Sequence, residues 1–317
     1  MAKQYALKYK KQEKRVFIFI TGVLKNILSA AIVGLMALFL LWMYAIAPRM
    51  DERFQLSDLI KYDYAHRGLH SNDNGVVENT LEAFHLAAES GFGVELDLQL
   101  TRDRQVVVYH DKSLSRLCGD RRRLQELTLS ELSAFTLLRT DHTIPTFEEA
   151  LQAVGERVPI IVEIKNYNDP EVICPLVWEI LKDYGGLYCV ESFNPQVIRW
   201  FKENQPQVIR GQLKNTQETG CTSEFEFFIR QNLCSNFLTR PDFTAYDCRT
   251  RETPAMWVAK RLFHMPEISW TVRDEETYRK LKAENCIIIF EGFLPGGTSE
   301  EKRRITTVGG YPAANAE

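Results

Sequence analysis

The sequence has few of the residue patterns that bind zinc or build a disulfide framework. It contains six histidines and seven cysteines in 317 residues. The cysteines are scattered without C-x-x-C spacing: Cys118, Cys174, Cys189, Cys221, Cys234, Cys248 and Cys286. This spacing is unlike that of zinc sites, and an odd number leaves at least one thiol without a disulfide partner. We expect most of these side chains to be small, buried apolar residues.

The sequence also lacks an excess of positive charge. It carries 39 Lys and Arg against 42 Asp and Glu, a formal net charge of −3 at pH 7. Residues 1–50 hold eight of the basic residues and one acidic residue, Glu13, which leaves 31 basic and 41 acidic residues for the rest. Such an acidic domain is not typical of nucleic-acid-binding proteins, so we expect no nucleic-acid partner. To bind phosphate esters it would need a metal ion or a local cation.

One long hydrophobic run lies near the N-terminus. Ile27 to Ala47 is almost uninterrupted, and Val16 to Leu24 extends it toward the start of the chain. A bilayer-spanning helix needs about 20 apolar residues. Basic residues before the run predict a cytoplasmic N-terminus and an external domain. A cleaved signal peptide is the alternative, because Ala45-Ile46-Ala47 has small-x-small spacing; the length of the run and Pro48 favour an uncleaved anchor.

We therefore expect a single-pass protein of the cell membrane, with its folded domain extracytoplasmic. The expected segments are a basic cytoplasmic N-terminus (1–15), a transmembrane anchor (16–48), a linker (49–61), a folded domain (62–297) and a C-terminal tail (298–317).

Beyond the linker, apolar strand patterns alternate with helical patterns. The predicted strands are Tyr62–Ala65, Gly93–Leu98, Pro159–Ile164, Leu187–Phe193, Val208–Leu213, Phe243–Tyr246, Ile268–Val272 and Cys286–Phe290. The predicted helices are Thr80–Ser90, Thr146–Val154, Pro170–Asp183, Pro195–Asn204, Glu224–Asn232, Thr253–Phe263 and Asp274–Glu284. This alternation predicts an α/β fold, a (β/α)8 TIM barrel.

Three local features refine this prediction. Val106–Arg139 is a small insertion after the second strand, with a short strand of its own and a solvated basic loop at Arg121–Arg123. Asn79-Thr80-Leu81-Glu82 has the pattern of a capping box at the start of the first barrel helix. Asp274 is placed to cap the last helix.

Charged residues lie at the ends of several predicted strands. Glu95 and Asp97 are two apart on one strand, so they share a face. Hard oxygen donors held in this way suit Mg²⁺ or Ca²⁺. His66 ends the strand before them, and Glu163 and Lys165 end the strand after. Because such barrels place their chemistry at the carboxyl ends of the strands, this arrangement predicts a hydrolytic metal site.

Short motifs follow one another in a fixed order. They are His66-Arg67-Gly68, Glu78-Asn79-Thr80, Gly93-Val94-Glu95-Leu96-Asp97, Thr101-Arg102-Asp103, His110-Asp111, Ile144-Pro145-Thr146, Glu163-Ile164-Lys165, Ser192-Phe193-Asn194 and Trp270-Thr271-Val272. From Asp63 to Pro295 this series resembles the glycerophosphodiester phosphodiesterase family. Each motif is weak alone, but their order is specific. Val77 stands where the family often has Pro, and Glu291 stands in place of an Asp at the last strand.

The resemblance implies a barrel that hydrolyses glycerophosphodiesters to glycerol 3-phosphate and an alcohol. It implies one divalent metal ion, Mg²⁺ or Ca²⁺, with Mn²⁺ also suited. The implied roles are metal binding for Glu95, Asp97 and Glu163, acid/base catalysis for His66 and His110, and phosphate binding for Arg67 and Lys165. Glu78, Trp270 and Glu291 are further pocket candidates, although Glu78 could serve only to stabilise a helix start.

Several alternatives stay open at the level of the sequence. Either histidine could be the acid, and either water or a substrate hydroxyl could attack phosphorus. The anchor suggests lipid-derived substrates, which makes lysophospholipase D activity on membrane lysolipids one alternative. A catalytically silent, membrane-tethered binding barrel is another, and the presence of both histidines and all three carboxylates argues against it.

Overall fold

The computed structural model describes residues 2–50, 58–214 and 223–296. The chain divides into two units, Met1–Ile46 and Ala47–Glu317. The first is one helix, α1 (Ala2–Ile46), which contains most of the predicted basic segment as well as the predicted anchor up to Ile46. Within its segment Glu13–Ile46, a stretch of 18 residues reaches a mean hydropathy of 2.3, and the segment is long and apolar enough to cross a membrane. The predicted C-terminal tail lies outside the described residues.

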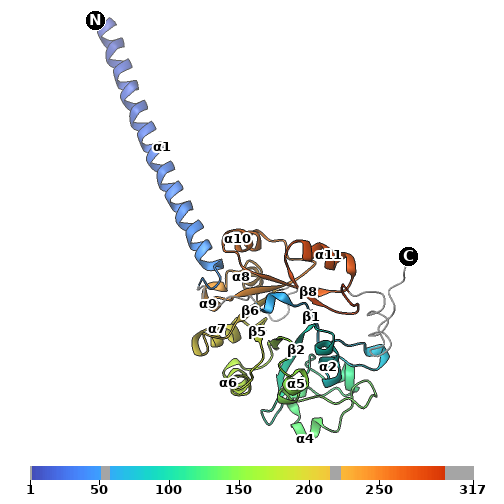
Figure 1. The fold of residues 1–317 in the computed structure, drawn as a ribbon. Helices are drawn as coiled ribbons and strands as arrows, with labels where there is room; N and C mark the ends of the chain where they lie inside the picture. Colours follow the sequence, from blue (N-terminus) through green and yellow to red (C-terminus); the bar gives the residue numbers. More distant parts are fainter. Residues whose placement is uncertain (1, 51–57, 215–222, 297–317) are drawn as a thin grey trace. The chain divides into compact units, whose positions relative to one another are not determined.

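The second unit is built on a closed sheet (Figure 1). Among the described residues, eight parallel strands follow one another around it, and the first pairs with both the second and the last. They are β1 (Tyr64–Ala65), β2 (Gly93–Leu100), β4 (Ile160–Ile164), β5 (Tyr188–Ser192), β6 (Arg210–Lys214), β7 (Phe243–Asp247), β8 (Glu267–Val272) and β9 (Ile287–Phe290). Closure leaves no open edge, and the predicted TIM barrel is confirmed.

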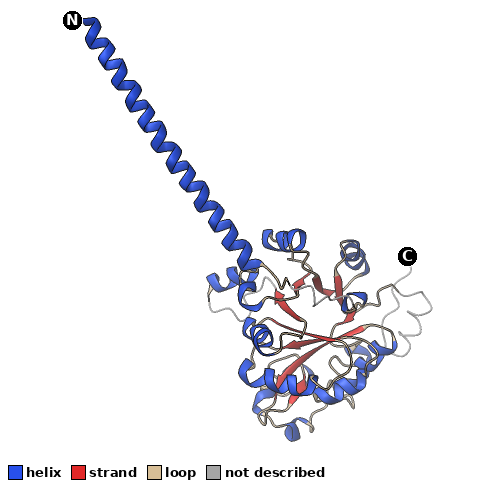
Figure 2. Ribbon diagram, turned by 60° about the vertical axis from the view of Figure 1, so that its left-hand side comes forward, coloured by secondary structure: helices blue, strands red, loops and turns tan. Residues whose placement is uncertain are grey.

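Helices surround the strands (Figure 2). They are α2 (Leu81–Glu89), α5 (Phe147–Val154), α6 (Pro170–Leu181), α7 (Pro195–Asn204), α8 (Glu224–Gln231), α9 (Asn236–Thr239), α10 (Pro254–Leu262) and α11 (Glu275–Ala283). The longer ones agree with the predicted helices to within two residues at each end. Asp274 caps α11 as predicted, because its side chain accepts a hydrogen bond from the Thr277 N–H.

The predicted capping role of Asn79 is wrong. Thr80 is the N-cap of α2, and its side chain accepts from the Ala83 N–H. Asn79 has a φ of 57°, a left-handed conformation that asparagine tolerates better than most residues. Its Nδ2 donates instead to Asp97 Oδ2 at 2.7 Å. The residue therefore orients a carboxylate in the barrel instead of starting a helix.

The insertion after β2 folds as predicted into a small layer of its own. Its strand β3 (Val106–Val108) pairs antiparallel with β2. Short helices follow, α3 (Ser115–Cys118) and α4 (Leu129–Leu132), over a separate apolar cluster. The loop Arg121–Arg123 is exposed, and Arg122 pairs with Asp120 beside it.

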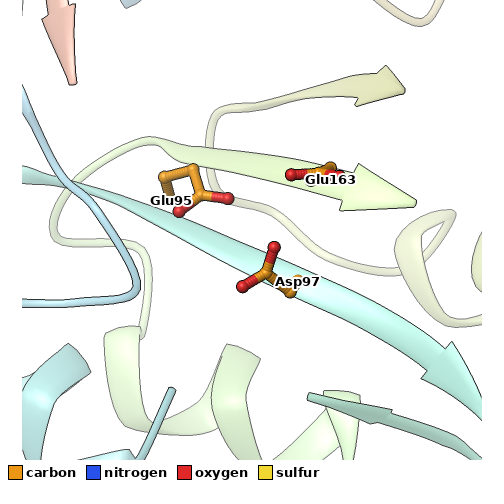
Figure 3. A group of neighbouring side chains, drawn as sticks. All are labelled: Glu95, Asp97 and Glu163. Atoms are coloured by element: carbon orange, nitrogen blue, oxygen red, sulfur yellow. The ribbon is translucent and has the colours of Figure 1, made fainter. Parts of the chain in front are cut away.

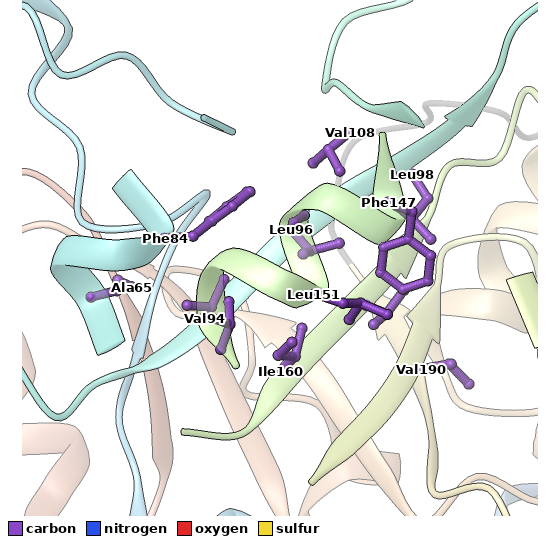
Figure 4. Close-up of a cluster of buried hydrophobic side chains, with 14 of the residues drawn as sticks. Ala65, Phe84, Val94, Leu96, Leu98, Val108, Phe147, Leu151, Ile160 and Val190 are labelled. Carbon is purple, nitrogen blue, oxygen red and sulfur yellow. The ribbon is translucent and has the colours of Figure 1, made fainter. Parts of the chain in front are cut away.

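Apolar side chains cover both faces of the strands. Outside, Val94, Leu96 and Leu98 of β2 pack against Phe84 and Phe147 from the helices (Figure 4). Inside lies a second apolar cluster: Tyr64, Ile161, Cys189, Leu213, Phe243, Ala245, Ile268, Ile287 and Ile289. Because alternate residues share a face, the next inward positions on β4 and β5 are Glu163 and Glu191. On these two strands the interior therefore changes from apolar to charged toward the carboxyl end.

The interior is too crowded for a side chain at one inward position of β6. A Cβ at Gly211 would lie 2.0 Å from the ring of Phe243 on the neighbouring strand. Glycine is therefore required there for the ring to fill the barrel. The six described cysteines are unpaired. Three of them, Cys174, Cys189 and Cys286, are buried, and the other three are partly exposed, so half of the described cysteines are buried where most were expected to be.

The described ends of the predicted linker, 49–61, are bound to the barrel. The Arg49 N–H donates to the Pro241 carbonyl at 2.9 Å, and its Nε lies 3.1 Å from Asp242 Oδ1. Leu59 is buried, and its carbonyl accepts from the Tyr64 hydroxyl at 2.9 Å. These residues belong to the folded domain; residues 51–57 lie outside the described part of the chain.

Candidate active site

Three buried carboxylates meet at the carboxyl end of the barrel (Figure 3). Glu95 and Asp97 project from β2, and Glu163 lies beside Asp97 on β4. One oxygen of each lies within 4.8 Å of the others. The three residues are at most 6% exposed. Three oxygen donors converging in this way fit a hard divalent cation.

Two cations offset part of this charge. Lys165 Nζ lies 2.8 Å from both Asp97 Oδ1 and Glu163 Oε1. The backbone N–H of Arg67 donates to Glu95 Oε2 at 2.9 Å, and its Nε lies 3.4 Å from Asp97 Oδ2. One negative charge remains in excess. Burial, together with Asp97 and Glu163, raises the pKa of Glu95 well above its ordinary value. The cluster therefore favours one more positive charge, which a metal ion would supply.

His66 follows β1 and is oriented by a carboxylate. Its Nδ1 lies 2.6 Å from Glu291 Oε2, which also accepts from Arg273 at 3.0 Å. Burial would raise the pKa of Glu291, but the hydrogen bond from His66 and the charge of Arg273 lower it to about 2. Burial lowers the pKa of His66 to about 4, and Arg67 adds to the effect. The ring is therefore neutral near pH 7, with Nδ1 protonated and Nε2 left as an acceptor 3.9 Å from Glu95.

His110 has the same kind of support from the insertion. Its Nδ1 lies 2.7 Å from Asp111 Oδ1, and its carbonyl accepts from the Tyr167 hydroxyl. Arg116 of α3 donates to both Asp111 oxygens, at 2.7 and 3.1 Å. Burial would raise the pKa of Asp111, but the hydrogen bonds from His110 and Arg116 lower it to about 2. Both histidines thus stand in a histidine–carboxylate–arginine series.

Glu78 connects this series to the phosphate-binding candidate Arg67. Arg116 donates to both Glu78 oxygens at 2.7 Å, and Arg67 donates to one of them at 2.7 Å. Asn72 supplies a further hydrogen bond at 2.8 Å. Burial would raise the pKa of Glu78, but these partners hold it well below its usual value. The carboxylate therefore binds two arginines, a larger role than stabilising a helix start.

The predicted residues surround one cavity of about 210 Å³. Those that line it are His66, Arg67, Glu95, His110, Glu163, Lys165 and Trp270. Asp97, Glu78 and Glu291 lie behind them and hold their neighbours in place through the contacts given above. The residues that the sequence predicted for one site are therefore brought together.

The model of the glycerophosphoryl diester phosphodiesterase family matches residues 66–290. The chain belongs to this family. Among curated relatives, glycerophosphodiester phosphodiesterase 1 of Bos taurus is 28% identical over 254 residues, which cover 68% of this chain and 73% of that protein. For eight of the curated relatives, the matched part spans 44% to 73% of their own lengths.

Solved structures of the phosphodiesterase family share the barrel. A glycerophosphodiester phosphodiesterase from Thermotoga maritima is 29% identical, with a TM-score of 0.56 over 72% of this chain and 94% of its own. An Oleispira antarctica phosphodiesterase, in complex with the product sn-glycerol-3-phosphate, has a TM-score of 0.60 at 20% identity, over 78% of this chain and 95% of its own. At that identity the likeness concerns the fold.

Two residues of this site were missed by sequence reasoning. Arg116 lies on the short helix α3 and has no local sequence pattern that marks it. Glu191 had a usable signal, because it is an acidic residue in an apolar strand pattern, two residues before Phe193. It lines the cavity beside Glu163.

Proposed function

We propose that the protein is a metal-dependent enzyme that hydrolyses glycerophosphodiesters to glycerol 3-phosphate and an alcohol. The observation that carries the proposal is the buried cluster of Glu95, Asp97 and Glu163 with a carboxylate-oriented histidine on either side. Membership of the family supports the substrate class. The three oxygen donors fit Mg²⁺, Ca²⁺ or Mn²⁺.

The site suits an anionic phosphodiester. Arg67 and Lys165 line the cavity and offer fixed positive charge to the non-bridging oxygens. Both are already held by carboxylates, so they are oriented before the substrate binds. A bound divalent ion would add Lewis-acid polarisation of a phosphate oxygen.

The two histidines move the protons. Hydrolysis must remove a proton from the attacking hydroxyl and return one to the leaving alkoxide. His66 and His110 each keep Nδ1 on a carboxylate, so each presents Nε2 for this exchange. One ring accepts and the other donates.

A product assay with a chelator arm tests this function. The purified chain with Mg²⁺, Ca²⁺ or Mn²⁺ should release glycerol 3-phosphate from glycerophosphocholine or a related diester, and chelation should stop the release. Choline release from lysophosphatidylcholine alone would instead favour lysophospholipase D activity. No product from any substrate would favour the silent binding barrel.

We further propose that α1 is a single membrane span, with residues 1–15 in the cytoplasm and the barrel outside. The apolar segment Glu13–Ile46 and the basic residues before it support this orientation. Protease added to intact cells should digest the barrel. A barrel that is protected until the cells are opened would contradict the orientation.

A further inference from the structure

Glu191 is a buried carboxyl with no partner. It lies on β5 in register with Glu163, is 1% exposed and lines the catalytic cavity. Its Oε2 is buried and makes no hydrogen bond. Every other buried acidic side chain of the described residues has a hydrogen-bond or ion-pair partner: Glu78, Glu95, Asp97, Glu163, Asp242, Asp247 and Glu267. Glu191 is the exception among them.

A second unpaired polar group lines the same cavity. The indole Nε1 of Trp270 on β8 is buried and donates to nothing in the described structure. The ring is fixed edge-on against Phe193, with centroids 5.6 Å apart. Buried polar groups are nearly always hydrogen-bonded, so an unpaired acceptor and an unpaired donor in one cavity indicate a ligand. A hydroxyl group can both donate to a carboxyl and accept from an indole N–H.

The shape of the cavity limits what this ligand is. At about 210 Å³ it is small, and Phe193, Leu213 and Ile289 give it an apolar wall. Arg67 and Lys165 also line it, and their positive charges suit a phosphate. A short carbon chain that bears hydroxyls and is joined to a phosphate fits the remaining space.

We propose that Glu191 and Trp270 form a hydroxyl-binding subsite for the glycerol half of the substrate. The inference rests on the proposed function and names the groups that select its substrate. A wider pocket of about 650 Å³ shares Arg249, Thr271 and Arg273 with the catalytic cavity and gives the alcohol half a place. An acyl chain on the glycerol would remove a hydroxyl donor and add volume, so the subsite favours deacylated glycerophosphodiesters over lysolipids.

The test compares two phosphates that differ only in hydroxyl groups. Binding of sn-glycerol 3-phosphate and of n-propyl phosphate to the Ca²⁺-loaded full chain is measured by calorimetry. The wild type should bind the glycerol compound roughly 10- to 100-fold more tightly. In Glu191→Leu, which keeps the volume but removes the acceptor, this ratio should fall toward one. Trp270→Phe should lower the ratio in part, because the ring stays and the donor is lost.

Glu191→Gln is the matched control, because its amide still offers an acceptor and should preserve most of the ratio. The melting temperature separates a binding role from a structural one. Glu191→Leu should melt at or above the wild-type temperature, since it removes a buried polar group that has no partner. A large drop in melting temperature would indicate a structural role and contradict the proposal.

Three further results would overturn the subsite. The first is equal binding of both phosphates by the wild type, and the second is an unchanged ratio in Glu191→Leu. The third is that Glu191→Leu binds both phosphates equally more weakly and also binds Ca²⁺ more weakly, which would make Glu191 a metal ligand. Turnover of glycerophosphocholine is measured on the same preparation. A preference for hydroxyls without turnover would reject the proposed function alone, and turnover without the preference would reject the subsite alone.

Discussion

Replacing Arg116 with alanine tests whether the insertion positions the catalytic groups. The guanidinium binds Asp111, which orients His110, and Glu78, which holds Arg67. Without it, both carboxylates lose a partner, and His110 and Arg67 are held less firmly. Because displacement of a catalytic group by about 1 Å can cost 100-fold in rate, kcat should fall roughly 10- to 100-fold. KM should change less, since Arg67 keeps its contacts with Asp97 and Glu95.

The exposure of the Arg116 and Glu78 side chains sets the size of the stability loss expected for Arg116→Ala. Breaking a buried ion pair costs about 3–5 kcal/mol, and breaking an exposed one costs about 0–1 kcal/mol. The Glu78 side chain is 3% exposed, but that of Arg116 is 43% exposed. Glu78 also keeps Arg67 and Asn72. We expect a loss of about 1–2 kcal/mol at pH 7, which for a domain of this size lowers Tm by roughly 2–8 °C.

The loss should depend on pH. The folded-state pKa values of Asp111 and Glu78 lie below those of the unfolded chain. Groups of this kind contribute stability above their unfolded pKa, about 4, and lose it as pH falls through the folded value. The Tm difference between wild type and Arg116→Ala should therefore have its largest value above about pH 5 and decrease between about pH 4 and 2.

The assay is kcat and KM on glycerophosphocholine, with thermal melts at several pH values. Arg199→Ala is the matched control, because the Arg199 side chain is 45% exposed and forms one ion pair, 2.8 Å from Glu203 on α7. Arg116→Lys keeps the charge without the planar fork and should restore activity only in part. Equal kcat and Tm in Arg116→Ala and Arg199→Ala would refute the positioning role.

Four further substitutions probe the site and the barrel. His66→Ala and His110→Ala should each lower kcat by roughly 100- to 10,000-fold with unchanged circular dichroism, and near-normal activity in either would remove that ring from acid/base catalysis. Glu95→Gln should weaken metal binding in a calorimetric titration, and an unchanged isotherm would remove Glu95 from the ligand set. Gly211→Ala should cost about 1–3 kcal/mol in a denaturant melt, because the added methyl meets the Phe243 ring; an unchanged midpoint would mean that the ring can shift.

The fold was predictable because its signals are local and repeated. Each strand and helix has its own apolar period, and the closed barrel follows from their alternation. Local pattern failed at Asn79, whose spacing to Glu82 fits a capping box. Its actual partner, Asp97, is 18 residues away on β2, and no periodicity encodes that contact.

The site likewise combines features that local sequence patterns predict with contacts that only the tertiary structure creates. Glu95 and Asp97 share a face through strand geometry alone, so their convergence was predictable. The contact of His66 with Glu291 spans 225 residues, and that of Arg116 with Glu78 spans 38. The lack of a partner at Glu191 is a property of the whole cavity, because it depends on what every surrounding strand fails to offer. Sequence spacing therefore finds the carboxylates that we propose as metal ligands, whereas the groups that we propose to orient and select are found only in the tertiary structure.

The two histidine series differ in how firmly they are held. Arg116 ties Asp111 to the buried Glu78, so His110 is fixed by the fold itself. Arg273 has a side chain 59% exposed, makes one ion pair with Glu291 and lines both the catalytic cavity and the wider pocket. In the proposed reaction, the alcohol half of the substrate lies against Arg273 and hence next to the carboxylate that orients His66. A change of the alcohol group should therefore alter the reaction rate through the orientation of His66. The orientation of His110 should be the same for every substrate.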